Sequence, residues 1–148
     1  MASFSILLFS SQQIVLVVAD NMNSSKAKLK CYEGNTKVCG TFHVNIGKNG
    51  LGWGFEHMKR QDMQYKLAIV VDYNHKGIKG RGSCIFMHIQ RTPDTPTVGC
   101  TSMSEQNIQK NAKWLDKKKN PILVQIPKKS AKEVIKLYPQ LQNSQLLQ

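Results

Sequence analysis

Several kinds of residue are scarce in this 148-residue chain, and each scarcity excludes or disfavours a class of protein. Only 9 acidic residues stand against 21 lysines and arginines, which gives a formal net charge of +12. Such a charge attracts anionic partners. Aromatic residues make up only 7% of the chain, and no stretch interleaves them with basic residues as single-strand nucleic-acid binders do. A basic nucleic-acid-binding module is therefore disfavoured, and most of the charge is interpreted as a solvated basic surface.

Long hydrophobic runs are also missing. Residues 4–9 and 14–19 form two short apolar runs, and neither approaches the roughly 20 residues of a transmembrane helix. We therefore expect no membrane span. No lysine or arginine precedes the first run, and no clear signal-peptidase site follows it before the second. Residues 1–11 are interpreted as a candidate leader remnant. An atypical leader and truncation from a longer precursor both stay open.

Cysteine is present but lacks metal-binding spacing. The four cysteines are Cys31, Cys39, Cys84 and Cys100. They form no C-x-x-C pair and no zinc-like pattern with histidine, so we expect no metal and no cofactor. Cys31 and Cys39 flank a predicted turn, and either a disulfide across a hairpin or two reduced thiols would fit. Cys84 begins an apolar run and is predicted to be a small core residue.

Patterning predicts a mainly β or α+β fold with one or two short helices. The expected strands cover residues 14–19, 27–32, 37–44, 66–73, 83–89 and 122–126. A helix is expected over residues 104–115 with Ser104 as its N-cap, and a capping box from Ser130 to Glu133 predicts a second. Residues 47–54 contain four glycines and are predicted to form a loop that Trp53 anchors in the core. The main domain is expected over residues 12–127, and a C-terminal helix and frayed tail over 128–148.

One histidine and one cysteine have the setting of a nucleophilic pair. His88 ends an apolar strand, and Cys100 follows Gly99 in a turn that leads toward the predicted helix. A cysteine just ahead of a helix N-terminus lies in a positive potential that favours the thiolate. Backbone N–H groups at positions 99–101 can converge on an oxyanion. The proline-bounded segment 92–96 can bring the cysteine back beside the histidine, which would act as its base.

Three segments carry a resemblance to a known family. They are Gly-Ser-Cys-Ile-Phe-Met-His at 82–88, Pro-Thr-Val-Gly-Cys-Thr-Ser-Met-Ser-Glu at 96–105, and the Trp-Leu-Asp to Gln-Ile-Pro stretch at 114–127. Together they resemble the L,D-transpeptidase (YkuD-like) catalytic domain, in the branch with a shortened Thr-x-Gly-Cys motif. The resemblance implies a mixed β-sheet sandwich. It also implies that Cys100 is the nucleophile and His88 its base, with Gly99, Thr101 and Thr97 around the oxyanion and substrate.

The resemblance further implies an acyl transferase of the bacterial envelope or periplasm that acts in cell-wall biogenesis. Its partners would be peptidoglycan tetrapeptide stems, cleaved after their diamino acid with release of D-alanine. The acyl group would be held as a thioester on Cys100. An amine would then form a cross-link, whereas water would make the enzyme a carboxypeptidase. Carbapenems would be expected to acylate the same thiol.

The chain departs from the family pattern at three places. Val98 replaces a histidine of the longer motif, and Ser102 replaces an arginine that often follows the cysteine. Gly54 is followed directly by Phe55 and Glu56, where relatives carry a sizeable segment that forms strands and part of the cleft. A catalytically impaired or inactive wall-binding relative is therefore the alternative. The remaining histidines are interpreted as surface or core residues, without a metal role.

Overall fold

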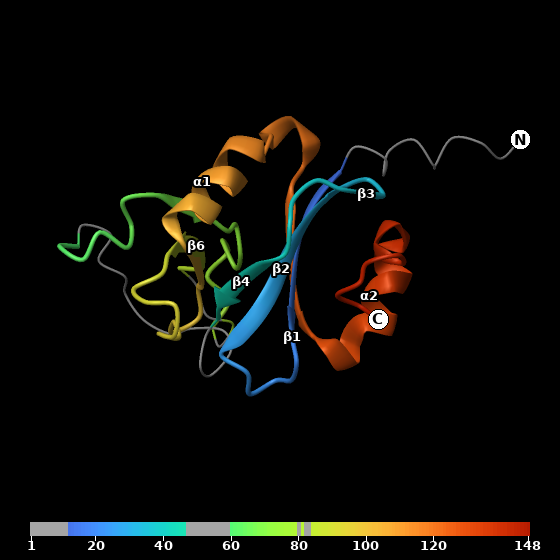
Figure 1. Ribbon diagram of the computed structural model, residues 1–148, viewed down its shortest axis with the longest axis horizontal. Coiled ribbons are helices and arrows are strands. Elements are labelled where there is room, and N and C mark those ends of the chain that lie inside the picture. Colours follow the sequence, from blue (N-terminus) through green and yellow to red (C-terminus); the bar gives the residue numbers. More distant parts are fainter. Residues whose placement is uncertain (1–11, 47–59, 80, 82–83) are drawn as a thin grey trace, which may run out of the picture. The chain divides into compact units, whose positions relative to one another are not determined.

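The computed structural model describes residues 12–46, 60–79, 81 and 84–148 (Figure 1). Over this part of the chain the fold is mainly β, with eight strands, two α-helices and three short 3₁₀ helices. The described residues divide into two compact units, each built from segments distant in sequence. The predicted leader and the predicted glycine loop with Trp53 lie outside the described residues.

The first unit is built around a completely buried strand. It contains the described residues among 1–21, 28–42 and 115–148. In β1 (Gln13–Ala19) all seven residues are buried. The strand lies between β2 (Lys26–Glu33) and β8 (Ile122–Pro127), and its parallel register with β8 pairs Ile14 with Ile122. A strand with neighbours on both edges and side chains covered on both faces needs a continuous apolar run, as the sequence predicted.

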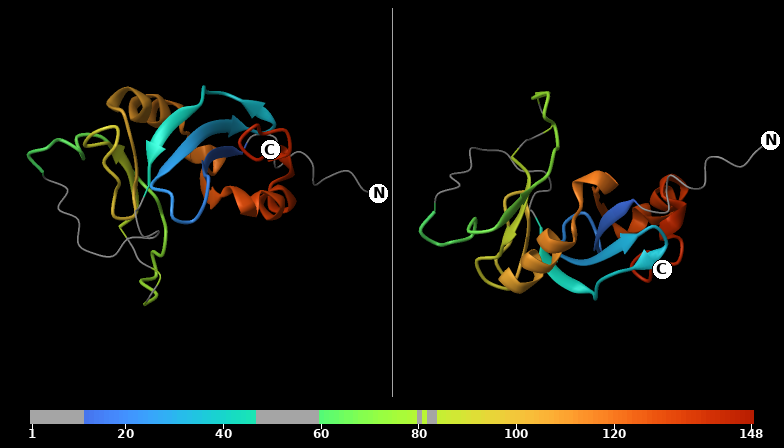
Figure 2. Two further views of the ribbon diagram at one scale, coloured as in Figure 1. Left: turned by 60° about the horizontal axis from the view of Figure 1, so that its bottom comes forward. Right: turned by 90° about the horizontal axis from the view of Figure 1, so that it is seen from above.

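The C-terminal segment covers one face of this sheet (Figures 1 and 2). It runs through η2 (Lys128–Ser130), α2 (Ala131–Leu137) and η3 (Pro139–Leu141). The shared apolar core of strands and tail consists of Ile14, Leu16, Val18, Tyr32, Val124, Ala131, Val134, Leu141 and Leu147. The prediction of a frayed tail over 140–148 was wrong, because Leu141 and Leu147 anchor the tail in this core.

Two local details of the first unit differ from the sequence prediction. The predicted capping box was wrong, because the side chain of Ser130 makes no capping hydrogen bond. The 3₁₀ helix η2 runs straight into α2, so Ser130 does not have the extended backbone of a capping residue. The predicted strand 37–44 is split into β3 (Thr36–Lys37) and β4 (Phe42–Asn45). β3 completes a tight antiparallel hairpin with β2.

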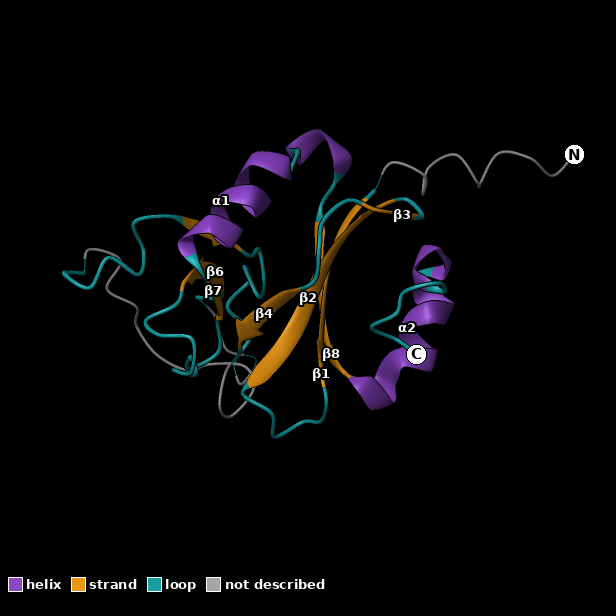
Figure 3. Ribbon diagram, viewed as in Figure 1, coloured by secondary structure: helices purple, strands orange, loops and turns teal. Residues whose placement is uncertain are grey.

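The second unit contains the strand order β5-β6-β7-β4. Its strands after β4 are β5 (Ala68–Val70), β6 (Phe86–Ile89) and β7 (Thr101–Met103). Figure 3 labels β6 and β7 together with α1 (Glu105–Trp114). β5 is antiparallel to β6, whereas β6 and β7 are parallel. The side-chain amide of Asn111 contacts the Met103 sulfur at 3.6 Å, so α1 covers the face of the strands that carries Met103.

Some of the helices and strands predicted from the sequence lie in the second unit. The helix was placed correctly, and Ser104 caps it by accepting a hydrogen bond from the N–H of Asn107. In the first unit, Asp116 caps η1 (Lys117–Lys119). The predicted strand 66–73 was too long, because β5 covers residues 68–70. β7 was not predicted.

The buried β1 strand gives a stability prediction. Leu16 is fully buried, whereas Leu137 at the end of α2 is 69% exposed. Replacing Leu16 with alanine should lower the free energy of unfolding by about 2–5 kcal/mol, because it removes buried methyl groups and leaves a cavity. Leu137→Ala is the matched control and should change it by less than about 0.5 kcal/mol. Urea denaturation followed by circular dichroism measures both, and equal effects would contradict the assigned core.

Candidate functional site

The register between β6 and β7 brings His88 to the strand beside the one that follows Cys100. His88 pairs directly with Ser102 in the parallel ladder. Side chains alternate between the faces of a strand, and Cys100 precedes Ser102 by two residues, immediately before β7. Cys100 itself lies in the bend before the strand, so the register places β7, which starts one residue after Cys100, beside the strand of His88. Met87 and Met103 lie on the opposite face, where α1 packs.

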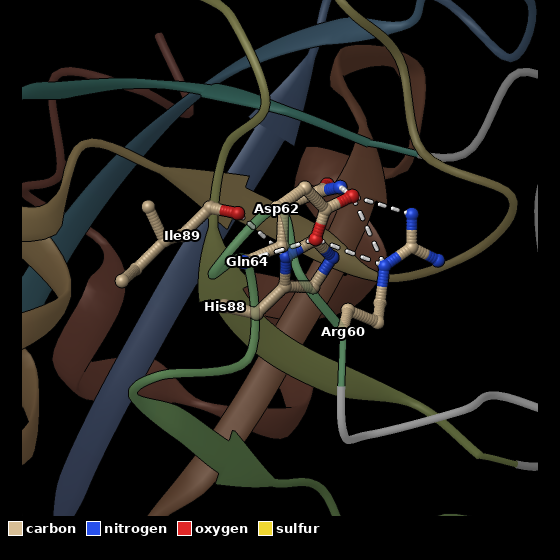
Figure 4. A network of polar contacts seen from close by, with 5 residues as sticks. All are labelled: Arg60, Asp62, Gln64, His88 and Ile89. Carbon is tan, nitrogen blue, oxygen red and sulfur yellow. Dashed lines mark hydrogen bonds and ion pairs between the residues drawn. The ribbon is translucent and has the colours of Figure 1, made fainter.

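His88 is held in one orientation and one tautomer. Its side chain is buried, and Nδ1 lies 2.8 Å from the backbone carbonyl oxygen of Ile89 (Figure 4). A carbonyl oxygen only accepts, so Nδ1 carries a hydrogen, and in the neutral ring Nε2 carries the lone pair. The ring of Tyr65 packs against the imidazole with 4.8 Å between the ring centres. His88 is therefore arranged to accept a proton at Nε2.

A polar segment ahead of β5 is fastened to the same strand (Figure 4). Arg60 forms an ion pair with Asp62 at 2.6 Å, and Asp62 also accepts hydrogen bonds from Gln64. The Arg60 guanidinium holds the pKa of the Asp62 carboxyl well below its usual range. The backbone N–H of Ile89 donates to the carbonyl of Gln64 at 3.1 Å. This segment thus fixes the end of β6, and no motif in the sequence had indicated it.

Cys100 lies in a turn that Thr97 closes. The Thr97 hydroxyl donates to the Cys100 carbonyl at 2.5 Å, and the Thr97 N–H donates to the carbonyl of Ile46 at 3.3 Å. Gly99 and Thr101 on either side of the cysteine are buried. The Cys100 thiol is only 5% exposed. It lies 3.7 Å from the carbonyl oxygen of Cys84, to which it donates.

Two sequence arguments about these cysteines were wrong. Cys100 does not stand at a helix N-terminus, because β7 lies between it and α1, and the helix field is confined to the first turn. Cys84 is exposed rather than a core residue. It precedes β6 and adopts a positive φ of 57°. Strand alternation therefore does not extend back to it, and it cannot be placed on the face of His88 by counting residues.

Sequence reasoning missed a polar row across three strands. Asn45 of β4 pairs with Ser102, which pairs with His88, and all three are at most 4% exposed. Asn45 donates from Nδ2 to the Thr92 carbonyl at 3.3 Å. In the described part of the chain, the buried Ser102 hydroxyl has no hydrogen-bond partner. Ser102 was the signal for this row in the sequence, and it had been noted only as a departure from a motif.

The arrangement supplies a thiol and an oriented imidazole. Nucleophilic acyl transfer uses these two kinds of group, with the imidazole taking the thiol proton. Within residues 12–46, 60–79, 81 and 84–148, no three His, Cys, Asp or Glu side chains gather as a metal site. Among the same residues, no helix has the length and apolar character needed to cross a membrane.

Comparison with protein-family models, curated proteins and solved structures gave no match to this chain. The family resemblance therefore rests on the sequence motifs alone.

Exposure reverses the order of thiol reactivity that the sequence suggested. Iodoacetamide should modify the exposed Cys84 faster than the buried Cys100 in the folded protein, because a reagent must reach the sulfur before thiolate character matters. Peptide mapping after timed labelling gives the two rates. The difference should vanish in concentrated urea. Faster labelling of Cys100 in the folded chain would contradict the burial described here.

The hydrogen bond from Thr97 can be tested separately. Thr97→Val removes the hydroxyl donor to the Cys100 carbonyl, and we expect a loss of about 1 kcal/mol of stability. The turn should loosen, so that Cys100 labels faster while Cys84 is unchanged. Thr97→Ser keeps the donor and should behave like the wild type. Equal Cys100 labelling rates in all three proteins would show that the hydroxyl does not hold the turn.

Proposed function

We propose that this chain is an L,D-transpeptidase-like acyl transferase that uses Cys100 as nucleophile and His88 as general base. The observation that carries the proposal is the state of the imidazole. Its Nδ1 hydrogen is committed to the Ile89 carbonyl, and the strand that follows Cys100 pairs directly with the strand of His88. A base with a fixed tautomer on the strand beside a thiol is what thioester chemistry requires.

The reaction follows from these two groups. Nε2 of His88 takes the thiol proton as the sulfur attacks the carbonyl carbon of the diamino acid, in the bond that joins it to the D-alanine of a tetrapeptide stem. The C–N bond breaks, and the imidazolium returns the proton to the departing amino group of D-alanine. The thioester on Cys100 is then attacked by an amine of another stem, which forms a cross-link. Attack by water instead gives a carboxypeptidase product.

The surrounding backbone supports the charge that develops during attack. N–H groups of residues 99–101 are assigned to the oxyanion, because they adjoin the reacting sulfur. Thr97 fixes their turn through the Cys100 carbonyl. Since the hydroxyl of Thr97 is already engaged, its contribution is to hold the backbone rather than to bind the substrate directly.

Peptidoglycan stem peptides are the proposed substrate, and the envelope or periplasm the proposed location. These two assignments rest on the motif resemblance. The net charge of +12 is compatible with a polyanionic wall.

A catalytically impaired wall-binding relative is the second candidate, and one observation favours it. Cys100 is 5% exposed and His88 is 4% exposed, so a peptide stem cannot reach them without a change in their surroundings. The sequence also lacks the segment expected after Gly54. Since binding and orientation of the stem supply much of the rate of acyl transfer, such a loss lowers turnover even when thiol and imidazole are in place.

Carbapenem acylation tests the proposed nucleophile and base. A carbapenem should add its mass slowly to Cys100, and Cys100→Ser should abolish the adduct. His88→Gln should slow acylation by about 10²-fold or more, because it removes the proton acceptor. His75→Gln is the matched control, since His75 is an exposed histidine in the same unit and should leave the rate unchanged. Intact-protein mass spectrometry with peptide mapping gives the site and the rate.

Turnover of tetrapeptide stems separates the two candidates. We expect weak or no release of D-alanine, in keeping with a shortened cleft. Robust cross-linking by the purified chain would contradict the impaired relative. Failure of the carbapenem to modify Cys100 in protein shown to be folded would contradict the acyl transferase and leave the wall-binding role.

A further inference from the structure

A second pair of thiols lies in the first unit. Cys31 belongs to β2 and is 2% exposed, whereas Cys39 follows β3 by two residues and is partly exposed. The hairpin returns the chain, and the N–H of Val38 donates to the Cys31 carbonyl at 3.0 Å. The backbone N–H of Cys31 donates to the sulfur of Cys39, also at 3.0 Å. Both residues are reduced in the structure.

The two thiols are unequal. The Cys31 thiol donates a hydrogen bond to the Cys39 sulfur, and this bond is the main reason that the pKa of Cys39 is lowered. The Cys31 N–H and the Lys37 and Lys30 ammonium groups lower it further, against the opposing effect of burial. The same hydrogen bond, together with burial, raises the pKa of Cys31. Cys39 is therefore the better nucleophile of the two, and the more accessible.

We propose that Cys31 and Cys39 form a reactive dithiol that is converted to a disulfide by disulfide compounds, with Cys39 attacking first and Cys31 resolving. The proposal stands on the hairpin geometry, on the bonds to the Cys39 sulfur and on the difference in exposure. It is independent of Cys100 and of the acyl-transfer proposal. The sequence alone did not decide between a disulfide bridge and two reduced thiols at these positions.

The small disulfide is the oxidant in this exchange, so no further redox partner is needed. The Cys39 thiolate attacks one sulfur of a small disulfide, forms a mixed disulfide and expels one thiolate. Cys31 then loses its proton and attacks the Cys39 sulfur, which forms the Cys31–Cys39 bond and expels the second thiolate. The two expelled thiolates take up two protons in all. The protein dithiol is oxidised by two electrons, and the small disulfide is reduced to two thiols.

The surroundings of Cys39 favour an anionic disulfide. Lys37 is exposed, and it acts on the Cys39 sulfur together with Lys30. These positive charges attract a carboxylate-bearing disulfide as well as stabilising the attacking thiolate. Oxidised glutathione, which carries carboxylates, is therefore a suitable probe, and cystamine, a cationic disulfide, is its matched comparison.

The test exposes the reduced full-length chain to oxidised glutathione, followed by alkylation and peptide mapping. We expect the Cys31–Cys39 disulfide to form, with loss of two hydrogens, and to be reversed by dithiothreitol. Cys31→Ala should trap the glutathione mixed disulfide on Cys39, because the resolving thiol is gone. Cys39→Ala should leave Cys31 unmodified over the same period. Cystamine should react with Cys39 more slowly than glutathione disulfide does.

Other outcomes would overturn the proposal. Absence of the disulfide in wild-type protein, shown to be folded by circular dichroism, would contradict the dithiol; this readout needs no variant. Stable trapping on Cys31 in Cys39→Ala would reverse the assigned roles. The exposed Cys84 is an internal reference. If Cys84 reacts with the disulfide faster than Cys39 does, the claim that Cys39 is an activated thiol is wrong. Urea should remove the difference between the thiols if the fold creates it.

Discussion

The parallel pairing of β6 with β7 is the constraint on which the candidate site depends. It sets His88 opposite Ser102 and brings the strand that follows Cys100 beside the strand of His88. A slip of one residue would turn His88 toward the opposite face, where α1 contacts Met103. The register is protected from both sides, because α1 packs on one face and Tyr65 packs against the imidazole on the other.

Backbone carbonyls accept hydrogen bonds from three polar side chains in and beside this part of the sheet. His88 donates to Ile89, and Asn45 donates to Thr92. Thr97 donates to Cys100 itself. Burying a polar group costs free energy unless it is hydrogen-bonded, and each of these bonds also fixes a side chain or a turn. The geometry of the site is therefore set by the same bonds that make its burial tolerable.

The sequence predicted the helices and strands that local residue patterns determine. It missed the strand that forms only through pairing with a distant strand. β1 was found because its apolar run is itself the requirement of a doubly covered strand, and the helix because Ser104 caps it. β7 was missed because three residues carry no periodicity, and only their register with β6 makes them a strand. Cys84 was misplaced because its positive φ, which ends the alternation ahead of β6, leaves no trace in composition.

The resting position of the Cys100 hydrogen has a consequence for the order of events. That hydrogen points to the Cys84 carbonyl, so it cannot at the same moment be passed to an imidazole. A sulfur that has lost its hydrogen, or that carries an acyl group, has nothing to donate to this carbonyl. The contact therefore exists only in the unreacted protein. To give its hydrogen to any other group, the Cys100 thiol must first turn away from the Cys84 carbonyl.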